Sequence, residues 1–212
     1  MMHFPKAPRP WGWQTHVLAR GRKWLEVPGN RSRERPHDYW SSYRASLKSG
    51  FRELCAYTVM WTPVRTVDRY IPWKEVRDTR SAHLAYQGDN LRYSVEWFNR
   101  DREATPVPDP YEVQNVWFEL LLPSLELVAT PAVPAAELHR VQAALEWLGK
   151  HDNVISTREG YWLEYRSLDA DANPCLSFEA LTRKAPLIAR ALRKNPEYLH
   201  PADRARLFAG TL

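Results

Sequence analysis

The sequence lacks the features that mark membrane-spanning, disulfide-stabilised and repetitive proteins. No apolar run approaches the roughly 20 residues that a helix needs to cross a bilayer, and stretches such as Phe118–Leu122 are short. Only two cysteines occur, Cys55 and Cys175, which are too few for a disulfide framework or a four-cysteine zinc site. Internal repeats and low-complexity tracts are also missing.

No apolar segment follows Lys6 and Arg9 near the start, so no secretory signal is visible. Together with the low cysteine content, this favours a reducing compartment, and we expect a cytoplasmic protein without a membrane partner. Hydrophobic residues make up 44% of the chain and charged residues 26%, which predicts a packed core. The ten Trp residues decide nothing alone, because Trp both fills cores and stacks on bases.

Positive charge is concentrated in the first half of the chain. Residues 1–103 contain 19 Lys or Arg against 11 Asp or Glu, whereas residues 104–212 contain 11 against 14. Contact with a polyanion, if there is one, is therefore expected in the first half. A solvated basic surface without a partner is the alternative.

The apolar spacing changes repeatedly along the first half. We expect an exposed loop over Gly29–Pro36, a helix from a cap at Asp38 to about Leu54, short strands over Cys55–Trp61 and Thr66–Ile71, a polar segment over Lys74–His83, and a helix from Leu91 to about Arg102. In the second half we expect a helix over Ala135–Gly149, a strand over Tyr161–Tyr165, and a helix over Phe178–Lys194 with a kink at Pro186.

These elements divide the chain into three regions. Residues 1–36 form a basic, Pro- and Arg-rich segment, residues 37–110 carry the strands, and residues 111–212 form an α-rich region packed on them. The expected fold class is α+β, with a small ββα element embedded among helices and a mainly helical C-terminal extension.

Three short motifs between positions 67 and 102 carry the candidate chemistry. They are Val67-Asp68-Arg69-Tyr70-Ile71-Pro72, Asp89-Asn90-Leu91-Arg92 and Asn99-Arg100-Asp101-Arg102. This series resembles the His-Asn-His (HNH) endonucleases, in which Asp-His on a strand is followed by Asn-Leu and then by His or Asn on a helix. Here Arg69 stands where that family has its histidine.

The surrounding sequence is similar to the small bacterial HNH proteins of Septu-type phage-defence systems. The similar positions are Cys55-Ala56-Tyr57, Ala85-Tyr86, Asn90-Leu91-Arg92-Tyr93, Trp97-Phe98-Asn99, Asp109-Pro110 and Leu122-Pro123-Ser124-Leu125. Some proteins of that branch pair the first motif with a second cysteine to hold structural zinc. Thr58 takes that place here, so zinc is not expected.

The resemblance implies a role for each matching residue. Asp68 and Asn99 would hold Mg²⁺ or another divalent metal, and Asn90 would orient the base. Contacts to nucleic acid, DNA in preference to RNA, fall to Arg92, Arg100 and Arg102. Outside the matching motifs, the basic loop offers Arg31, Arg33 and Arg35 as further contacts to a phosphate backbone. Arg69 occupies the base position but keeps its proton at physiological pH, so it can clamp phosphate but cannot act as a base.

Simpler interpretations stand beside these roles. Asp68 and Arg69 can form a structural ion pair, Asn90 can brace a loop, Asn99 can be a helix-surface amide, and the three clustered arginines can be solvated. Substitute catalytic groups are His83, the His37–Asp38 pair and Cys55.

Three hypotheses of function follow. The first is a degenerate HNH-like protein that binds nucleic acid without cutting it, for which the resemblance implies a place in a bacterial anti-phage system. The second is an active metal-dependent nuclease with a replaced base. The third is a structural or regulatory subunit of a larger complex, for which the resemblance implies an ATPase partner.

Overall fold

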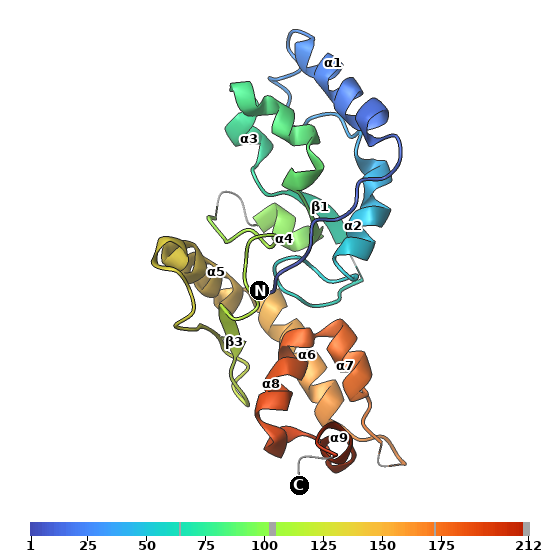
Figure 1. Cartoon of the computed structure of the whole chain (residues 1–212), viewed down its shortest axis with the longest axis vertical. Helices are drawn as coiled ribbons and strands as arrows, with labels where there is room; N and C mark the ends of the chain where they lie inside the picture. The colour runs from blue at the N-terminus through green and yellow to red at the C-terminus, as the bar shows by residue number, and fades with distance from the viewer. Residues whose placement is uncertain (64, 102–104, 172, 210–212) are drawn as a thin grey trace.

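The computed structural model describes residues 1–63, 65–101, 105–171 and 173–209, with the backbone alone at 65 and 99–101. It is an α+β protein, as the sequence predicts, and its described residues form two small antiparallel sheets among helices. In Figure 1 the first half (blue to green) and helices α6–α9 (orange to red) form two groups along the long axis. Helix α5 and strand β3 lie beside them.

Helices and strands follow one another along the chain with connections of varied length. The α-helices are α1 (Arg20–Glu26), α2 (Arg44–Gly50), α3 (Trp73–Val76), α4 (Glu96–Asp101), α5 (Leu138–Lys150), α6 (Asp152–Arg166), α7 (Phe178–Lys184), α8 (Pro186–Lys194) and α9 (Pro201–Leu207). The strands are β1 (Arg65–Arg69), β2 (Leu91–Val95), β3 (Phe118–Leu120) and β4 (Leu127–Ala129). A π-helix, η1 (Gln14–Ala19), precedes α1, and 3₁₀ turns are η2 (Ser41–Tyr43), η3 (Arg80–Tyr86), η4 (Gly88–Asn90), η5 (Ala135–Glu137) and η6 (Pro196–Tyr198).

Strand β1 pairs antiparallel with β2, and helix α4 follows β2 directly. The prediction of a helix from Leu91 is therefore wrong over residues 91–95. Leu91, Tyr93 and Val95 alternate with polar residues at the period of a strand, and β2 is buried along its whole length. Leu91, Val95 and Phe98 also recur at helical spacing, which explains the error.

The segment 55–61 is a tight loop and not the predicted strand. The amide of Cys55 donates to the carbonyl of Met60, the amide of Val59 donates to Cys55, and Val59 has a φ of 57°. Its only β-pairing among the described residues is an isolated bridge between Leu54 and Trp61. The apolar composition reflects burial of a loop, because residues 55–60 are all buried.

The helix expected over residues 38–54 is shorter at both ends. It begins with the 3₁₀ turn η2 and ends at Gly50, after which Arg52 and Glu53 take positive φ values. A Cβ atom at Gly50 would lie 2.7 Å from the Cβ of Ala7, so a glycine there lets another chain segment pass. The polar segment 74–83 also contains structure, since it includes most of α3 and half of η3.

The strand predicted over Tyr161–Tyr165 is also wrong, since these residues lie within α6. Val154, Arg158, Tyr161 and Tyr165 are buried at spacings of three and four, which is the period of one helix face. The predicted helix over 135–149 is confirmed by η5 and α5, and the predicted kink at Pro186 separates α7 from α8.

Residues 1–10, which we call the N-terminal strap, cross the molecule and join distant segments. The amide of Phe4 donates to the carbonyl of Pro110 at 3.0 Å, and the amide of His3 donates to the side chain of Asn115 at 2.9 Å. The carbonyl of Ala7 accepts a hydrogen bond from the hydroxyl of Tyr43. The strap is therefore part of the packed protein.

One connected hydrophobic core contains residues from all three predicted regions. Five tryptophans are buried in it, namely Trp13, Trp24, Trp40, Trp73 and Trp117, while Trp11 is almost fully exposed. Over the described residues, no helix combines the length and apolar character required to cross a membrane.

Candidate functional site

Asp68 is a buried carboxylate on β1, with only 4% of its surface exposed. It accepts a hydrogen bond from the hydroxyl of Tyr57, which the tight loop 55–61 directs inward. The ring of Tyr57 stacks on Phe98 of α4, with centroids 4.2 Å apart and planes 8° from parallel. The carboxylate is thus enclosed between the loop and the sheet, in contact with a phenol that stacks on the helix.

Of the two expected metal ligands, the structure describes the side chain of Asp68 but not that of Asn99. Mg²⁺ prefers several oxygen ligands in octahedral geometry, and Asp68 already accepts from Tyr57. No group of three or more His, Cys, Asp or Glu side chains comes together in the described part of the chain. Asn99 and Arg100 belong to α4, but their side chains lie outside the described residues, as does the whole of Arg102.

Arg69 ends β1 and lies between an aromatic ring and several charges. Its guanidinium carbon is 5.4 Å from the ring centre of Trp40. Burial lowers the pKa of Arg69, the negative charges of Asp68 and Asp38 oppose that shift, and the positive charge of Arg35 adds to it. The base position of the resembled family therefore holds a cation that experiences a second cation nearby.

Asn90 ties both ends of the β1–β2 connection together. Its side-chain oxygen accepts from the amide of Ile71 at 2.7 Å, and its side-chain nitrogen donates to the carbonyls of Ile71 and Leu84. The carbonyl of Asn90 also accepts from the amide of Tyr70 at 2.9 Å. This geometry favours the loop-brace interpretation, because the side-chain oxygen and both N–H groups of this buried amide bind backbone groups.

Arg92 is a structural residue, which corrects the expectation that it contacts phosphate. Only 1% of its surface is exposed. Its guanidinium donates to both carboxylate oxygens of Asp109 and to the carbonyls of Asp89 and Leu91, and these contacts use all five N–H groups. The ring centre of Tyr111 lies 3.7 Å from its guanidinium carbon. No donor is left for an external phosphate.

The clustered arginines lie on the exposed loop that the sequence predicts, although Asn30 and Pro36 within it are buried. Asn30 anchors the loop by donating to the carbonyl of Trp24, and the indole N–H of Trp73 donates to the carbonyl of Arg33 at 3.0 Å. Arg35 lies within electrostatic range of Arg69. The hydrogen bond from Trp73 thus holds the loop against α3, 40 positions further along the chain.

The substitute catalytic groups do not form a catalytic arrangement. His83 is exposed, and one of its ring nitrogens contacts the carbonyl of Arg80 in its own turn. His37 stacks on Tyr39 with ring centres 4.2 Å apart. Cys55 is buried, 3.9 Å from the hydroxyl of Ser94. None of these contacts joins them to Asp68.

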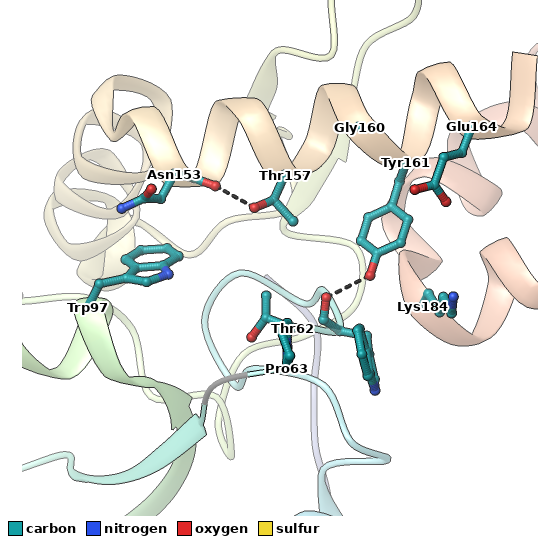
Figure 2. A pocket seen from close by; sticks show the side chains of 10 residues that line it. Thr62, Pro63, Trp97, Asn153, Thr157, Gly160, Tyr161, Glu164 and Lys184 are labelled. Atoms are coloured by element: carbon teal, nitrogen blue, oxygen red, sulfur yellow. Dashed lines mark hydrogen bonds between the residues drawn. The ribbon is translucent and has the colours of Figure 1, made fainter. Parts of the chain in front are cut away.

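Sequence reasoning missed Tyr57 as the partner of Asp68, and Asp109 as the partner of Arg92. The partners are 11 and 17 positions apart. A Tyr or an Asp at such a separation gives no indication in the sequence of which side chain it will contact. Sequence reasoning also missed a cavity of about 440 Å³ between the first half and the C-terminal helices. Figure 2 shows Trp97 at one end and Tyr161 and Lys184 at the other, with the hydroxyl of Tyr161 donating to the carbonyl of Trp61 at 2.7 Å.

Comparison with known proteins adds no assignment: no protein-family model, curated protein or solved structure matches the chain.

Proposed function

We propose that the chain is an HNH-like protein that binds nucleic acid without cleaving it. The observation that carries the proposal is the cluster of exposed arginines, Arg31, Arg33 and Arg35, on a loop that the indole of Trp73 anchors. Exposed guanidinium groups close together in the sequence create a positive patch that attracts a phosphate backbone. Arginine also binds phosphate through two parallel hydrogen bonds.

The order of elements supports the HNH-like part of the proposal. Strand β1, a connection of 21 residues, strand β2 and helix α4 follow one another, and Asn90 braces the connection. Asp68 lies on the first strand and Asn99 on the helix, as the resemblance implies. A role in a bacterial phage-defence system, with an ATPase subunit as partner, follows from the resemblance alone.

The same site argues against cleavage. Phosphodiester hydrolysis requires a group that takes a proton from water, and Arg69 holds its own proton at physiological pH. It also requires positive charge on the phosphate, for which the family uses a metal, and the expected ligand Asp68 is buried and already accepts a hydrogen bond from Tyr57. Fixed guanidinium groups at this place bind phosphate but generate no nucleophile.

The first experiment measures binding and cleavage side by side. Duplex DNA and structured RNA are titrated with the wild-type chain and with a variant in which Arg31, Arg33 and Arg35 are all Gln. We expect weaker binding by the variant. Its plot of log affinity against log salt should have a slope that is smaller by about 1 for each phosphate that it no longer neutralises. The matched control has the same change to Gln at three arginines that are exposed in the C-terminal half, Arg183, Arg193 and Arg206.

Cleavage is tested with Mg²⁺ and Mn²⁺ on the wild type, Arg69→His and Asp68→Ala. We expect none from the wild type. If the wild type cuts and Asp68→Ala does not, the protein is an active nuclease with a replaced base. Equal binding by both triple variants would instead remove the nucleic-acid proposal.

A further inference from the structure

A groove of about 530 Å³ runs between β4 and helices α5 and α6, away from the exposed arginines of the first half. Six consecutive residues, 124–129, line one side of it. Residues 124–126 precede β4, and all three residues of β4 line the groove. Side chains of a strand alternate between faces, so lining by successive residues of β4 indicates that the groove follows its backbone edge. Leu145 of α5 and Ile155 of α6 supply apolar walls opposite.

The edge of β4 that faces away from β3 has unused backbone groups. The amide of Leu121 donates to Glu126 and the amide of Thr130 donates to Trp117, which fixes the alternation of hydrogen-bonded pairs. Leu127 and Ala129 then direct their N–H and C=O groups away from β3. No other described residue bonds to these groups, so β4 can accept a third strand.

Arg158 lines the same groove and is buried without a counter-ion. Only 6% of its surface is exposed, and one N–H donates to the carbonyl of Leu125 at 2.8 Å. Within the described ranges this is its single hydrogen bond, and no nearby carboxylate contributes to its electrostatics. Burial alone lowers the pKa of Arg158. None of its guanidinium nitrogens is both fully buried and unpaired, so the donors that are not used by Leu125 remain accessible to a carboxylate.

We propose that this groove binds an extended peptide of a partner protein, which adds to β4 as a strand and places an Asp or Glu carboxylate on Arg158. Backbone pairing would supply affinity, and the buried Arg158 would select a carboxylate at one position. The exposed rim has a net negative charge, because it carries three glutamates and one lysine, namely Glu126, Glu146, Glu159 and Lys150. Basic residues on either side of the carboxylate therefore complement the rim.

The test uses the full chain and a pool of capped peptides, Lys-x-x-Asp-x-x-Lys, in which x is a mixture of Val, Ile, Thr and Tyr. Heteronuclear NMR follows the amides of Leu127 and Ala129 and the side-chain Nε of Arg158. We expect saturable shifts at these groups, and about tenfold weaker binding of the pool with Asn in place of Asp. A pool with Glu covers the longer carboxylate.

Gly149 offers a matched pair of variants, because it lines the groove and a Cβ atom there meets nothing within 4 Å. Gly149→Phe fills the groove and should abolish binding, whereas Gly149→Ala should retain it. Arg158→Met should remove the preference for Asp over Asn. Equal affinity for the Asp and Asn pools, shifts confined to another surface, or no binding of either acidic pool at millimolar concentration would overturn the proposal.

Discussion

The carboxylate of Asp109 accepts two hydrogen bonds from the buried guanidinium of Arg92 through its Oδ1 atom, which lies 2.9 Å from Nε and 2.6 Å from one terminal nitrogen. The pair joins β2 to the segment after α4, and 1% of the Arg92 side chain and 13% of the Asp109 side chain are exposed. This contact fixes the strand that lies opposite Asp68.

Asp109→Asn should lower the free energy of unfolding by about 3 to 5 kcal/mol, because it leaves the Arg92 cation buried without its counter-charge. Urea denaturation followed by circular dichroism measures the change. Glu179→Gln is the control, since it breaks the exposed pair with Arg183 and should cost less than about 0.5 kcal/mol. A cost for Asp109→Asn as small as that of the control would show that the pair is not needed.

Asn90→Ala should expose the amide of Ile71 to exchange, because that amide no longer has its acceptor in the Asn90 side chain. Three side-chain hydrogen bonds disappear, at about 1 kcal/mol each. Hydrogen exchange at Ile71 reports on the loop, and exchange at Ser94, whose amide faces β1 in the register of the two strands, reports on the strand. If Ile71 keeps its protection while the protein stays folded, the loop has another brace.

Gly21→Ala should destabilise the protein by about 1 to 3 kcal/mol, although alanine is the better helix former. A Cβ atom at Gly21 would lie 2.4 Å from ring carbons of Tyr86, so α1 has to shift. Gly149→Ala is the matched substitution in α5, where space is open, and it should stabilise by up to about 1 kcal/mol. The two melting temperatures should therefore move in opposite directions.

Asp89 should make stability depend on pH in the acid range. The hydrogen bond from Arg9, reinforced by Lys6, lowers the pKa of Asp89 below its ordinary value of 3.8. A carboxylate with a depressed folded-state pKa stabilises the fold above its ordinary pKa, and that stabilisation is lost as pH falls through the folded pKa. Urea midpoints measured from pH 5 downward should fall less steeply for Asp89→Asn than for the wild type. Parallel curves would contradict this expectation.

Local pattern was enough to predict much of the fold. The strand that ends at Arg69, the helix at residues 138–150 and the break at Pro186 all follow from spacing and proline chemistry. Two of the errors fall where apolar residues fit both a strand and a helix, at Leu91–Val95 and Tyr161–Tyr165, and a third at residues 55–61, where a buried loop has the composition of a strand. At such places tertiary partners decide between strand and helix, and those partners lie far away in sequence.

The candidate site shows the same limit. The exposure of Arg31 and Arg33 could be predicted from loop composition, and a bracing role for Asn90 is compatible with its sequence position. The burial of Arg92 could not be predicted, because an Arg in a strand looks the same whether it faces solvent or an Asp 17 positions later. The inward position of Tyr57 depends on a turn at Val59, which has a positive φ. Valine rarely adopts this backbone conformation, so the sequence does not predict a turn there.

The N-terminal strap has a consequence for the order of folding. Its backbone is bonded to Pro110 and Asn115, and the contact between His3 and Asn115 spans 112 positions. Closing so long a loop is entropically costly and slow, so the strap should dock late, after the β1–β2 pair has formed. During synthesis, the strap cannot make its final contacts until residue 115 has left the ribosome. Until then Phe4 should remain exposed to solvent, and the surface that the strap covers should remain uncovered.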